Sequence, residues 1–426
     1  MTNLPLTKNI DMSREPFDIG QYRHAGGYEG MLRMFKDMAP ADVLETVKNS
    51  GLKGRGGAGF PTGLKWSFVP SGEDAPKTKY LVVNADEMEP GTFKDRLLME
   101  GDPHLLIEGM VIAAYTIQAN TAYIFLRGEY LRAEALLRAA IAQAKDQGFL
   151  GKNIQGSGFD LEIILHTSAG RYICGEETAL LNALEGKRAN PRSKPPFPQV
   201  SGLWGKPTIV NNVETICNLP GIINYGIEWY KNLGTGEDAG TKLFGVSGRV
   251  RNPGCWEMPL GTPIRELLEE RAGGMCEGYQ LRAFLPGGGS TDFLLPEHLD
   301  LTLQYDVIAK AGSRLATGTM IILDDHTCPV GMVGNLMRFF SHESCGWCTP
   351  CRDGLPWVDS IFRRLESGEG QIADLQILTE HLEYLGPGRT FCALAPGAMA
   401  PLGSALKHFR EDFETHIHAG GCPWQK

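Results

Sequence analysis

Apolar and polar positions in the first half of the chain predict strands and helices that alternate along it. Short apolar runs predict buried strands at residues 80–84, 122–126 and 160–166. Apolar side chains at helical spacing predict helices at residues 41–49, 103–118, 131–147 and 179–184. This rhythm favours a parallel sheet in an α/β domain, which follows an extended N-terminal arm and a first helix.

A proline-rich stretch at residues 190–220 interrupts the rhythm, and we expect no helix in it before Val213. Beyond residue 240, short strands and one helix that Thr262 caps predict a small β-grasp-like module. From Val330 the apolar spacing predicts four helices, at residues 330–342, 354–366, 371–385 and 397–415. Short connections between helices are typical of a bundle. The expected domains are therefore residues 1–240, 241–328 and 329–426.

The composition excludes several classes of protein. The 426 residues are 42% hydrophobic and 21% charged, an ordinary balance for a globular protein, and the net charge of −9 argues against binding of nucleic acid. Ten cysteines are too few for a disulfide scaffold. The N-terminus lacks the apolar core of a secretory signal, so we expect a cytoplasmic protein. Because no run of about 18 apolar residues occurs, any link to a membrane should pass through a partner.

One cysteine motif points to a metal centre. Cys345, Cys348 and Cys351 are spaced by two residues, and Cys392 follows much later. Three thiolates in one run with a distant fourth are typical of a [4Fe–4S] cluster. A four-cysteine zinc site remains the alternative, although it normally pairs two separate C-x2-C motifs. A disulfide pair is least favoured in a reducing compartment.

A glycine-rich loop at residues 51–68 could approach a ligand closely. Gly54, Gly56 and Gly59 satisfy G-x-G-x-x-G, but no strand precedes them, so an ordinary dinucleotide fold is not expected. The loop nevertheless offers unshielded N–H groups, with Arg55 and Lys65 as cations for a phosphate. The nearby rings of Phe60, Trp66 and Phe68 either stack on a ligand or pack in the core.

Polar clusters follow several predicted elements, and each has two interpretations. Residues 84–89 follow a strand, so they either bind a heterocycle and ribose or form a solvated turn. Glu176 and Glu177 either suit a helix dipole or accept hydrogen bonds from a nucleotide, and would then favour NAD over NADP. Asn211 and Asn212 either cap a helix or bind a ring. Lys194 and Phe197 look like an exposed cation and a stacking ring.

Five motifs together carry a family resemblance: GRGGAGFPTG at 54–63, NADEMEPGTFKDR at 84–96, AGRYICGEETAL at 169–180, VNNVET at 210–215 and ESCGWCTPCR at 343–352. From about residue 28 to 415 the chain resembles the FMN-carrying, NADH-oxidising subunit of bacterial respiratory NADH:quinone oxidoreductase. The resemblance implies an atypical Rossmann-like α/β domain, a ubiquitin-like β-grasp module and a four-helix bundle that holds an iron–sulfur cluster.

The resemblance also implies site residues. FMN would be bound by Gly54, Arg55, Gly56, Lys65, Asn84, Asp86, Tyr172, Gly175, Glu176, Asn211, Asn212 and Thr215. NADH would be bound by Gly57, Gly59, Phe60, Gly63, Phe68, Glu89, Glu177, Lys194 and Phe197, with Glu89 and Glu177 supporting the reaction. The [4Fe–4S] cluster would be held by Cys345, Cys348, Cys351 and Cys392. No acid–base residue is needed, because the cofactors carry the hydride and the single electrons.

The family implies two partners, a thioredoxin-like [2Fe–2S] subunit and a large iron–sulfur subunit, which would place the chain at the inner face of the cell membrane. A diaphorase subunit of a soluble NAD-linked hydrogenase or formate dehydrogenase is the nearest alternative. A zinc-stabilised nucleotide-binding scaffold is a more distant one. Cys174 is expected to be a packed residue, and no role is assigned to Cys217, Cys255, Cys276, Cys328 and Cys422.

Overall fold

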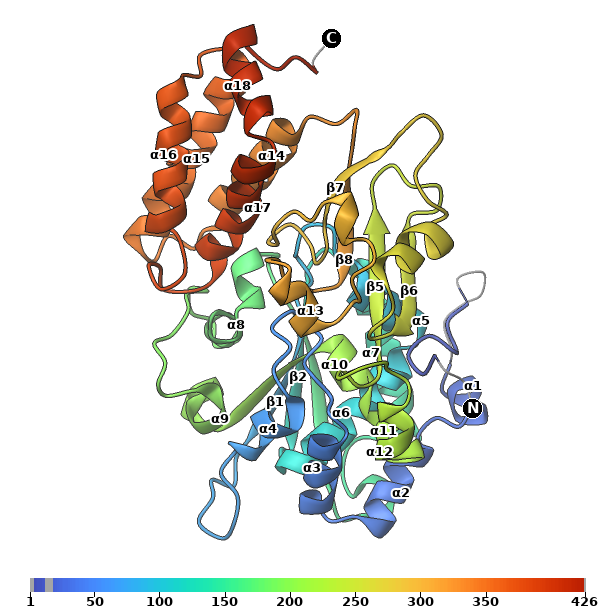
Figure 1. Cartoon of the computed structure of the whole chain (residues 1–426). Coiled ribbons are helices and arrows are strands. Elements are labelled where there is room, and N and C mark those ends of the chain that lie inside the picture. The colour runs from blue at the N-terminus through green and yellow to red at the C-terminus, as the bar shows by residue number, and fades with distance from the viewer. Residues whose placement is uncertain (1–3, 12–17, 425–426) are drawn as a thin grey trace. The chain divides into compact units, whose positions relative to one another are not determined.

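The computed structural model describes residues 4–11 and 18–424 (Figure 1). These residues divide into two compact units. The first extends to Leu243 apart from Glu89–Thr92, and includes Glu257–Thr262. The second contains Glu89–Thr92, Phe244–Trp256 and the chain from Pro263 onward. The three domain boundaries expected above stay a prediction, and the expected N-terminal arm falls partly on residues 1–3 and 12–17, outside the described residues.

A four-stranded parallel sheet forms the centre of the first unit. Its strands are β1 (Tyr80–Ala85), β2 (Thr121–Leu126), β3 (Glu162–Thr167) and β4 (Thr208–Asn212), in the order β3-β2-β1-β4. The expected parallel sheet is thus confirmed. Strand β4 was not foreseen, because it lies within the proline-rich stretch. The strand order changes direction between β1 and β4, and ligands of open α/β sheets bind at such a switch point, beyond the carboxyl ends of the strands.

Helices surround this sheet. The α-helices of the first unit are α1 (Ile19–His24), α2 (Glu29–Asp37), α3 (Pro40–Asn49), α4 (Thr62–Ser67), α5 (Lys94–Gly101), α6 (Pro103–Ile117), α7 (Leu131–Asp146), α8 (Glu177–Leu184), α9 (Pro198–Ser201), α10 (Val213–Cys217), α11 (Leu219–Tyr225) and α12 (Ile227–Lys231). Three 3-10 turns accompany them, η1 (Ile154–Gly156), η2 (Tyr172–Gly175) and η3 (Leu203–Gly205).

Helix α6 packs against β1 and β2, and nearly all of its residues are buried. The Asp102 side chain accepts a hydrogen bond from Leu105 N at the start of α6. Pro103 occupies the first turn, where backbone N–H groups have no partner within the helix, so its missing N–H costs no hydrogen bond. Proline is tolerated in the first turn of α9 for the same reason, and this helix begins at Pro198. The expectation that no helix precedes Val213 was therefore wrong, since a proline excludes the interior of a helix and not its first turn.

A second four-stranded sheet, of mixed direction, has the order β6-β5-β8-β7. Its strands are β5 (Thr241–Ser247), β6 (Gly254–Pro259), β7 (Leu281–Leu285) and β8 (Thr319–Asp324). Strands β5 and β8 are parallel, whereas β7 and β8 are antiparallel. The accompanying helical segments are the π-helical turn η4 (Glu266–Arg271), the 3-10 turn η5 (Pro296–His298) and α13 (Tyr305–Lys310).

The remainder of the second unit is helical, with α14 (Pro329–Glu343), α15 (Thr349–Ser367), α16 (Ile372–Tyr384), α17 (Leu394–His408) and α18 (Arg410–Ala419). Helix α14 packs against α15 and α17, and α16 packs against the same two helices (Figure 1). The last predicted helix is two helices, because the backbone leaves helical geometry at Phe409. Helix α15 begins earlier than predicted, with Pro350 in its first turn.

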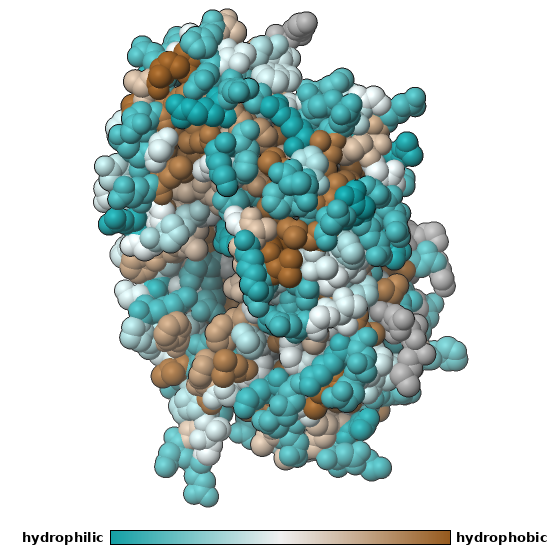
Figure 2. Space-filling model, viewed as in Figure 1, coloured by the Kyte–Doolittle hydropathy of each residue, from teal (hydrophilic) through white to brown (hydrophobic). Residues whose placement is uncertain are grey.

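Within the described part of the chain, no helix has both the length and the apolar character to cross a membrane. On the face drawn in Figure 2, hydrophilic side chains predominate and apolar ones lie in separate patches.

Candidate functional site

The polar residues expected to bind a ligand gather at the carboxyl end of the parallel sheet. Asn84 and Asn212 are direct neighbours in the register of β1 and β4, at the switch point of the sheet. The Asn84 side chain donates to Gly175 O at 3.1 Å, so the turn η2 lies beside the end of β1. Asp86 is buried and accepts from Ser168 Oγ at 3.0 Å. Three segments far apart in the sequence thus meet where the fold favours a ligand.

The glycine loop is fixed against the start of α10 by its main chain. Arg55 N donates to Thr215 Oγ1 at 2.8 Å. A Cβ on Gly56 would lie 3.1 Å from Asn212 Cβ, which is closer than side chains normally approach. Gly57 has φ +129°, a conformation that L-residues avoid. The loop therefore needs glycine both for close approach and for its turn.

The charge of Arg55 suggested a cation for a phosphate, but the structure buries its side chain. Its guanidinium is fully buried and donates to Tyr230 Oη at 3.0 Å and to the carbonyls of Ala239 and Thr241, each at 3.1 Å. These contacts make the side chain an anchor that ties the glycine loop to the segment before β5. The charge of this side chain is therefore directed into the interior of the first unit.

Lysine and glutamate side chains form a compact ionic group beside the loop. Lys65 Nζ lies 2.8 Å from both Glu177 Oε2 and Val210 O. Lys194 Nζ lies 2.9 Å from Glu176 Oε1 and 3.2 Å from Glu177 Oε1. Burial raises the pKa of Glu177, but the two lysines outweigh it and hold the pKa below its ordinary value. Glu177 is therefore a carboxylate that already has two cationic partners.

The capping interpretation holds for Asn212, whose Oδ1 accepts from Glu214 N at 3.0 Å at the start of α10. Glu176, which was expected to suit the helix dipole, also caps a helix: its Oε2 accepts from Thr178 N and Ala179 N, each at 2.9 Å, at the start of α8. Both residues nevertheless lie at the carboxyl end of the sheet. Capping and ligand binding are thus compatible uses of these side chains.

The aromatic candidates divide into one buried ring and three exposed rings. Trp66 is 1% exposed, and its Nε1 donates to Asn211 Oδ1 at 2.8 Å, so it is a core residue. Phe60, Phe68 and Phe197 are 46%, 51% and 53% exposed, which leaves their faces open to stack on a ring.

The other candidates are placed as follows. Gly54 N donates to Phe60 O, Gly59 takes a left-handed turn, Gly63 lies in α4 directly against the Lys48 backbone, and Tyr172 begins η2. Glu89 belongs to the second unit, where its Oε1 accepts from Ser290 N at 2.7 Å.

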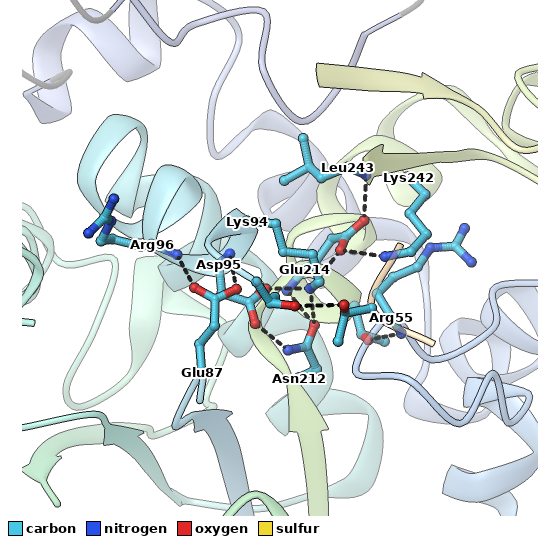
Figure 3. Close-up of polar contacts among 12 residues, drawn as sticks. Arg55, Glu87, Lys94, Asp95, Arg96, Asn212, Glu214, Lys242 and Leu243 are labelled. Atoms are coloured by element: carbon cyan, nitrogen blue, oxygen red, sulfur yellow. Dashed lines mark hydrogen bonds and ion pairs between the residues drawn. The ribbon is translucent and has the colours of Figure 1, made fainter. Parts of the chain in front are cut away.

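Sequence reasoning missed a buried charge network behind the site, drawn in Figure 3. At its centre Glu214 is fully buried, 2.7 Å from Lys94 Nζ and 3.2 Å from Lys242 Nζ, and accepts from Leu243 N at 2.8 Å. Asp95 in turn lies 2.7 Å from Lys94 Nζ and accepts from Asn212 Nδ2 at 2.6 Å. No signal in one sequence pairs these residues, because they come from separate segments.

Burial and charge have opposite effects on the pKa values of this network. Burial raises the pKa of Glu214, but Lys242 and Lys94 lower it below the ordinary value. Burial lowers the pKa of Lys242 to about 8, despite the favourable contact with Glu214. Burial together with the charge of Asp95 raises the pKa of Glu87 to about 7. Glu214 is therefore the anion that both buried lysines share, and Asp95 is a second partner of Lys94.

The four candidate cluster cysteines lie at one end of the helical region. Cys345 follows α14, Cys348 precedes α15, Cys351 is in the first turn of α15, and Cys392 precedes α17. Burial raises the pKa of the Cys351 thiol to about 12, and the charges of the other three contribute to the rise. The four sulfurs thus share one electrostatic neighbourhood, in which ligated iron would stabilise their thiolates.

Comparisons with known proteins agree with this arrangement. Residues 47–221 match the family model described as the Nuo51 FMN-binding domain, residues 243–293 the SLBB domain, and residues 331–416 the NADH-ubiquinone oxidoreductase-F iron-sulfur binding region. The chain is therefore of the class of NADH-oxidising flavoprotein subunits, with FMN and a [4Fe–4S] cluster as cofactors. The iron–sulfur interpretation of the cysteine motif is favoured over zinc.

Relatives identify the particular family. The F subunits of NADH-quinone oxidoreductase from Salmonella typhimurium and Escherichia coli are each 58% identical over 413 residues, covering 97% of this chain and 93% of theirs. The corresponding protein of Mycobacterium tuberculosis is 50% identical over 414 residues, which are 96% of this chain and 93% of that protein. The chain belongs to the family of the F subunits of NADH-quinone oxidoreductase.

Among solved structures, an NAD+-reducing [NiFe]-hydrogenase in its H2-reduced state aligns with a TM-score of 0.83 and 35% identity. The alignment covers 95% of this chain and 67% of the hydrogenase chain. The fold of this chain thus also occurs within a longer chain.

We expect Glu214→Gln to lower the free energy of unfolding by about 3–5 kcal/mol, because it leaves the buried Lys242 without its anion and Lys94 with only one of its two. Urea unfolding followed by circular dichroism measures this loss. Adding Lys242→Met should recover part of it by removing one of those lysines. Equal stability of Glu214→Gln and the wild type would contradict the central part given to this carboxylate.

Proposed function

We propose that the carboxyl end of the parallel sheet binds FMN and NADH, and that the second unit holds the cluster which takes the electrons onward. In this proposal FMN is contacted by the glycine loop, by Asn84 and Asp86, by η2, and by the starts of α8 and α10. When bound, FMN accepts hydride from NADH and releases the electrons singly. The protein groups position the two rings and exclude water.

The observation that carries the flavin site is the empty space in front of Gly175. Its φ lies outside the left-handed region, so its backbone conformation does not require glycine. A Cβ there would meet no heavy atom within 4 Å, so packing does not require glycine either. Since Asn84 donates to the carbonyl of this residue, the space lies at the end of β1. Gly175 is exposed, and this open space beside its backbone supports a site where a ligand can approach the main chain closely.

The proposed NADH site uses the exposed rings of Phe60, Phe68 and Phe197 as stacking surfaces. Lys65, Lys194 and Glu177 offer charged and hydrogen-bonding groups beside them. Because Glu177 remains ionised, it would oppose the extra phosphate of NADPH. Glu89 remains a proposed NADH contact.

We further propose that the second sheet and its helical segments form a ubiquitin-like β-grasp module, and that the helices from α14 onward form the bundle of the cluster domain. The parallel pair β5–β8 and the antiparallel pair β7–β8 support the first assignment. The mutual packing of α14, α15, α16 and α17 supports the second. Cys345, Cys348, Cys351 and Cys392 are the proposed ligands.

In the assembled enzyme the proposed neighbours are a thioredoxin-like [2Fe–2S] subunit and a large iron–sulfur subunit, at the inner face of the cell membrane. The hydrogenase likeness favours a second setting, a diaphorase unit of a soluble hydrogenase. The NADH-quinone oxidoreductase relatives match at higher identity and over nearly their full length, which supports the respiratory setting. The subunits that co-purify with the chain distinguish the two.

We expect Gly175→Ala to weaken FMN binding about tenfold, or about 1.4 kcal/mol, because the methyl group enters the space proposed for the flavin. Flavin fluorescence after equilibrium dialysis measures the affinity. Thermal unfolding of the apoprotein should be unchanged, since the methyl group meets no protein atom. Gly403→Ala, in helix α17 at ordinary contact distance, serves as the control and should retain FMN. Full FMN affinity in Gly175→Ala would refute the placement of the flavin.

We expect Cys348→Ala to lose cluster iron and quinone-linked electron transfer while it keeps part of the NADH-to-ferricyanide activity. The reason is that ferricyanide can take electrons without the cluster. Iron analysis and the two activity assays measure the separation, with Cys276→Ala as a matched variant that should keep both activities. If both activities fell equally in Cys348→Ala, the proposed division between flavin and cluster would be wrong.

We expect Glu177→Gln to raise the NADPH/NADH ratio of kcat/KM about fivefold, equivalent to about 1 kcal/mol. The substitution removes a negative charge and frees Lys65 and Lys194 to face a phosphate. Glu185→Gln is the matched control, because Glu185 also pairs with two cations, at the other end of α8. An unchanged ratio in Glu177→Gln would show that this carboxylate does not select the coenzyme.

A further inference from the structure

A second group of metal-ligating side chains lies in the helical region, apart from the four candidate cluster cysteines. Cys328 precedes α14, Glu366 is in the last turn of α15, His416 is in α18, and Cys422 is in the tail that follows. One ligand atom from each lies within 4.8 Å of all the others. Two of these residues are cysteines to which the sequence assigned no role.

This group lies at the opposite end of α14 and α15 from the cluster cysteines. Cys328 is at the start of α14, whereas Cys345 follows its end. Glu366 is near the end of α15, whereas Cys351 is in its first turn. Since α14 has 15 residues, about 20 Å of helix separates the two groups. The second group is therefore not part of the cluster site.

The distances within the group suit a single small ion. Cys328 Sγ lies 3.3 Å from His416 Nε2, which lies 3.6 Å from Glu366 Oε1. For tetrahedral zinc with bonds of about 2.0–2.3 Å, neighbouring ligand atoms are about 3.3–3.8 Å apart. The convergence of four ligand atoms within 4.8 Å leaves room for one ion and not for a four-iron cube.

The histidine is oriented as a metal ligand. His416 is fully buried, and its Nδ1 lies 2.7 Å from Asp412 O. A carbonyl oxygen only accepts, so Nδ1 is the donor of this contact and Nε2 faces Cys328. Such a hydrogen bond on the far nitrogen is the usual support of a histidine ligand. Gly331 N also donates to Cys328 Sγ at 3.2 Å.

Close backbone packing brings the tail to the ends of the helices. Gly421 has φ +132°, and its N–H donates to His416 O at 3.0 Å. A Cβ on Gly368, after α15, would lie 2.3 Å from Gly420 O. The tail is thus turned back against α15, and Cys422 joins three ligands that the helices already hold.

We propose that Cys328, Glu366, His416 and Cys422 bind one structural Zn2+ ion, which fastens the C-terminal tail to the ends of α14 and α15. Binding releases the two thiol protons to solvent, so the ion is held by two thiolates, a carboxylate and a neutral imidazole. Zinc fits this donor set because it takes sulfur and nitrogen ligands in a tetrahedron. Four protein ligands leave no open position, which makes the site structural.

The test uses the full-length chain, exposed to one equivalent of ZnCl2 and freed of loosely bound metal by gel filtration. We expect about one zinc per wild-type chain by elemental analysis. Zinc X-ray absorption should show two sulfur ligands at about 2.3 Å and two lighter ligands at about 2.0–2.2 Å. Cys422→Ser, a change in the tail that leaves the helices intact, should lose the zinc and keep its iron.

Two matched variants separate the two metal sites. Cys348→Ala should lose iron and keep zinc, and Cys276→Ser should keep both metals. The proposal is overturned if the wild type retains no zinc, if Cys422→Ser binds as much zinc as the wild type, or if mass spectrometry finds a Cys328–Cys422 disulfide in freshly isolated protein. Failure of the flavin and cluster assignments would alter FMN and iron contents and leave this zinc result unaffected.

Discussion

The first unit depends on one buried anion, the Glu214 carboxylate. It lies between Lys94 at the start of α5 and Lys242 in β5, and it also binds the backbone of Leu243. A buried ion is tolerated only with partners, so the charges of Glu214 and Lys242 are stable only where these segments meet. The next residue, Thr215, accepts from the main chain of Arg55 and so fixes the glycine loop. The position of the glycine loop is therefore fixed by the charge network around this carboxylate.

Much of the fold could be predicted because periodicity is a local property. The strands β1 and β2 are short apolar runs, and the helices α3 and α7 bury one face, whereas α6 is buried over nearly its whole length. Two elements that were not predicted also have local causes. Strand β4 has only five residues and lies within a proline-rich stretch. Helix α9 begins at a proline, which the first turn of a helix tolerates. The break at Phe409 divides a helical pattern that continues unchanged on both sides. Short elements and irregular backbone leave little periodic signal.

The site could be predicted as a set of residue types and not as a set of contacts. Asn84, Asn212 and the η2 turn lie together at the end of the sheet, as strand ends in α/β folds require. The partners of Arg55 and Trp66 lie far away along the sequence, and no single sequence shows such pairs. Both side chains are buried: Arg55 anchors the glycine loop, and the ring of Trp66 packs in the core. The buried lysines were missed for the same reason, since charged residues are ordinarily expected at the surface.

These placements limit what the side chains of the proposed flavin site can offer to a phosphate. Lys65 and Lys194 are matched by Glu177 and Glu176, and the charge of Arg55 is directed into the interior. The side chains beside the loop thus carry two positive and two negative charges, which leaves little net attraction for an anion. We infer that the main chain attracts the anion instead, through N–H groups of the glycine loop and of nearby helix starts. Recognition of this kind depends on how closely the backbone can approach, so a single added methyl group should disturb it more than the loss of a surface charge.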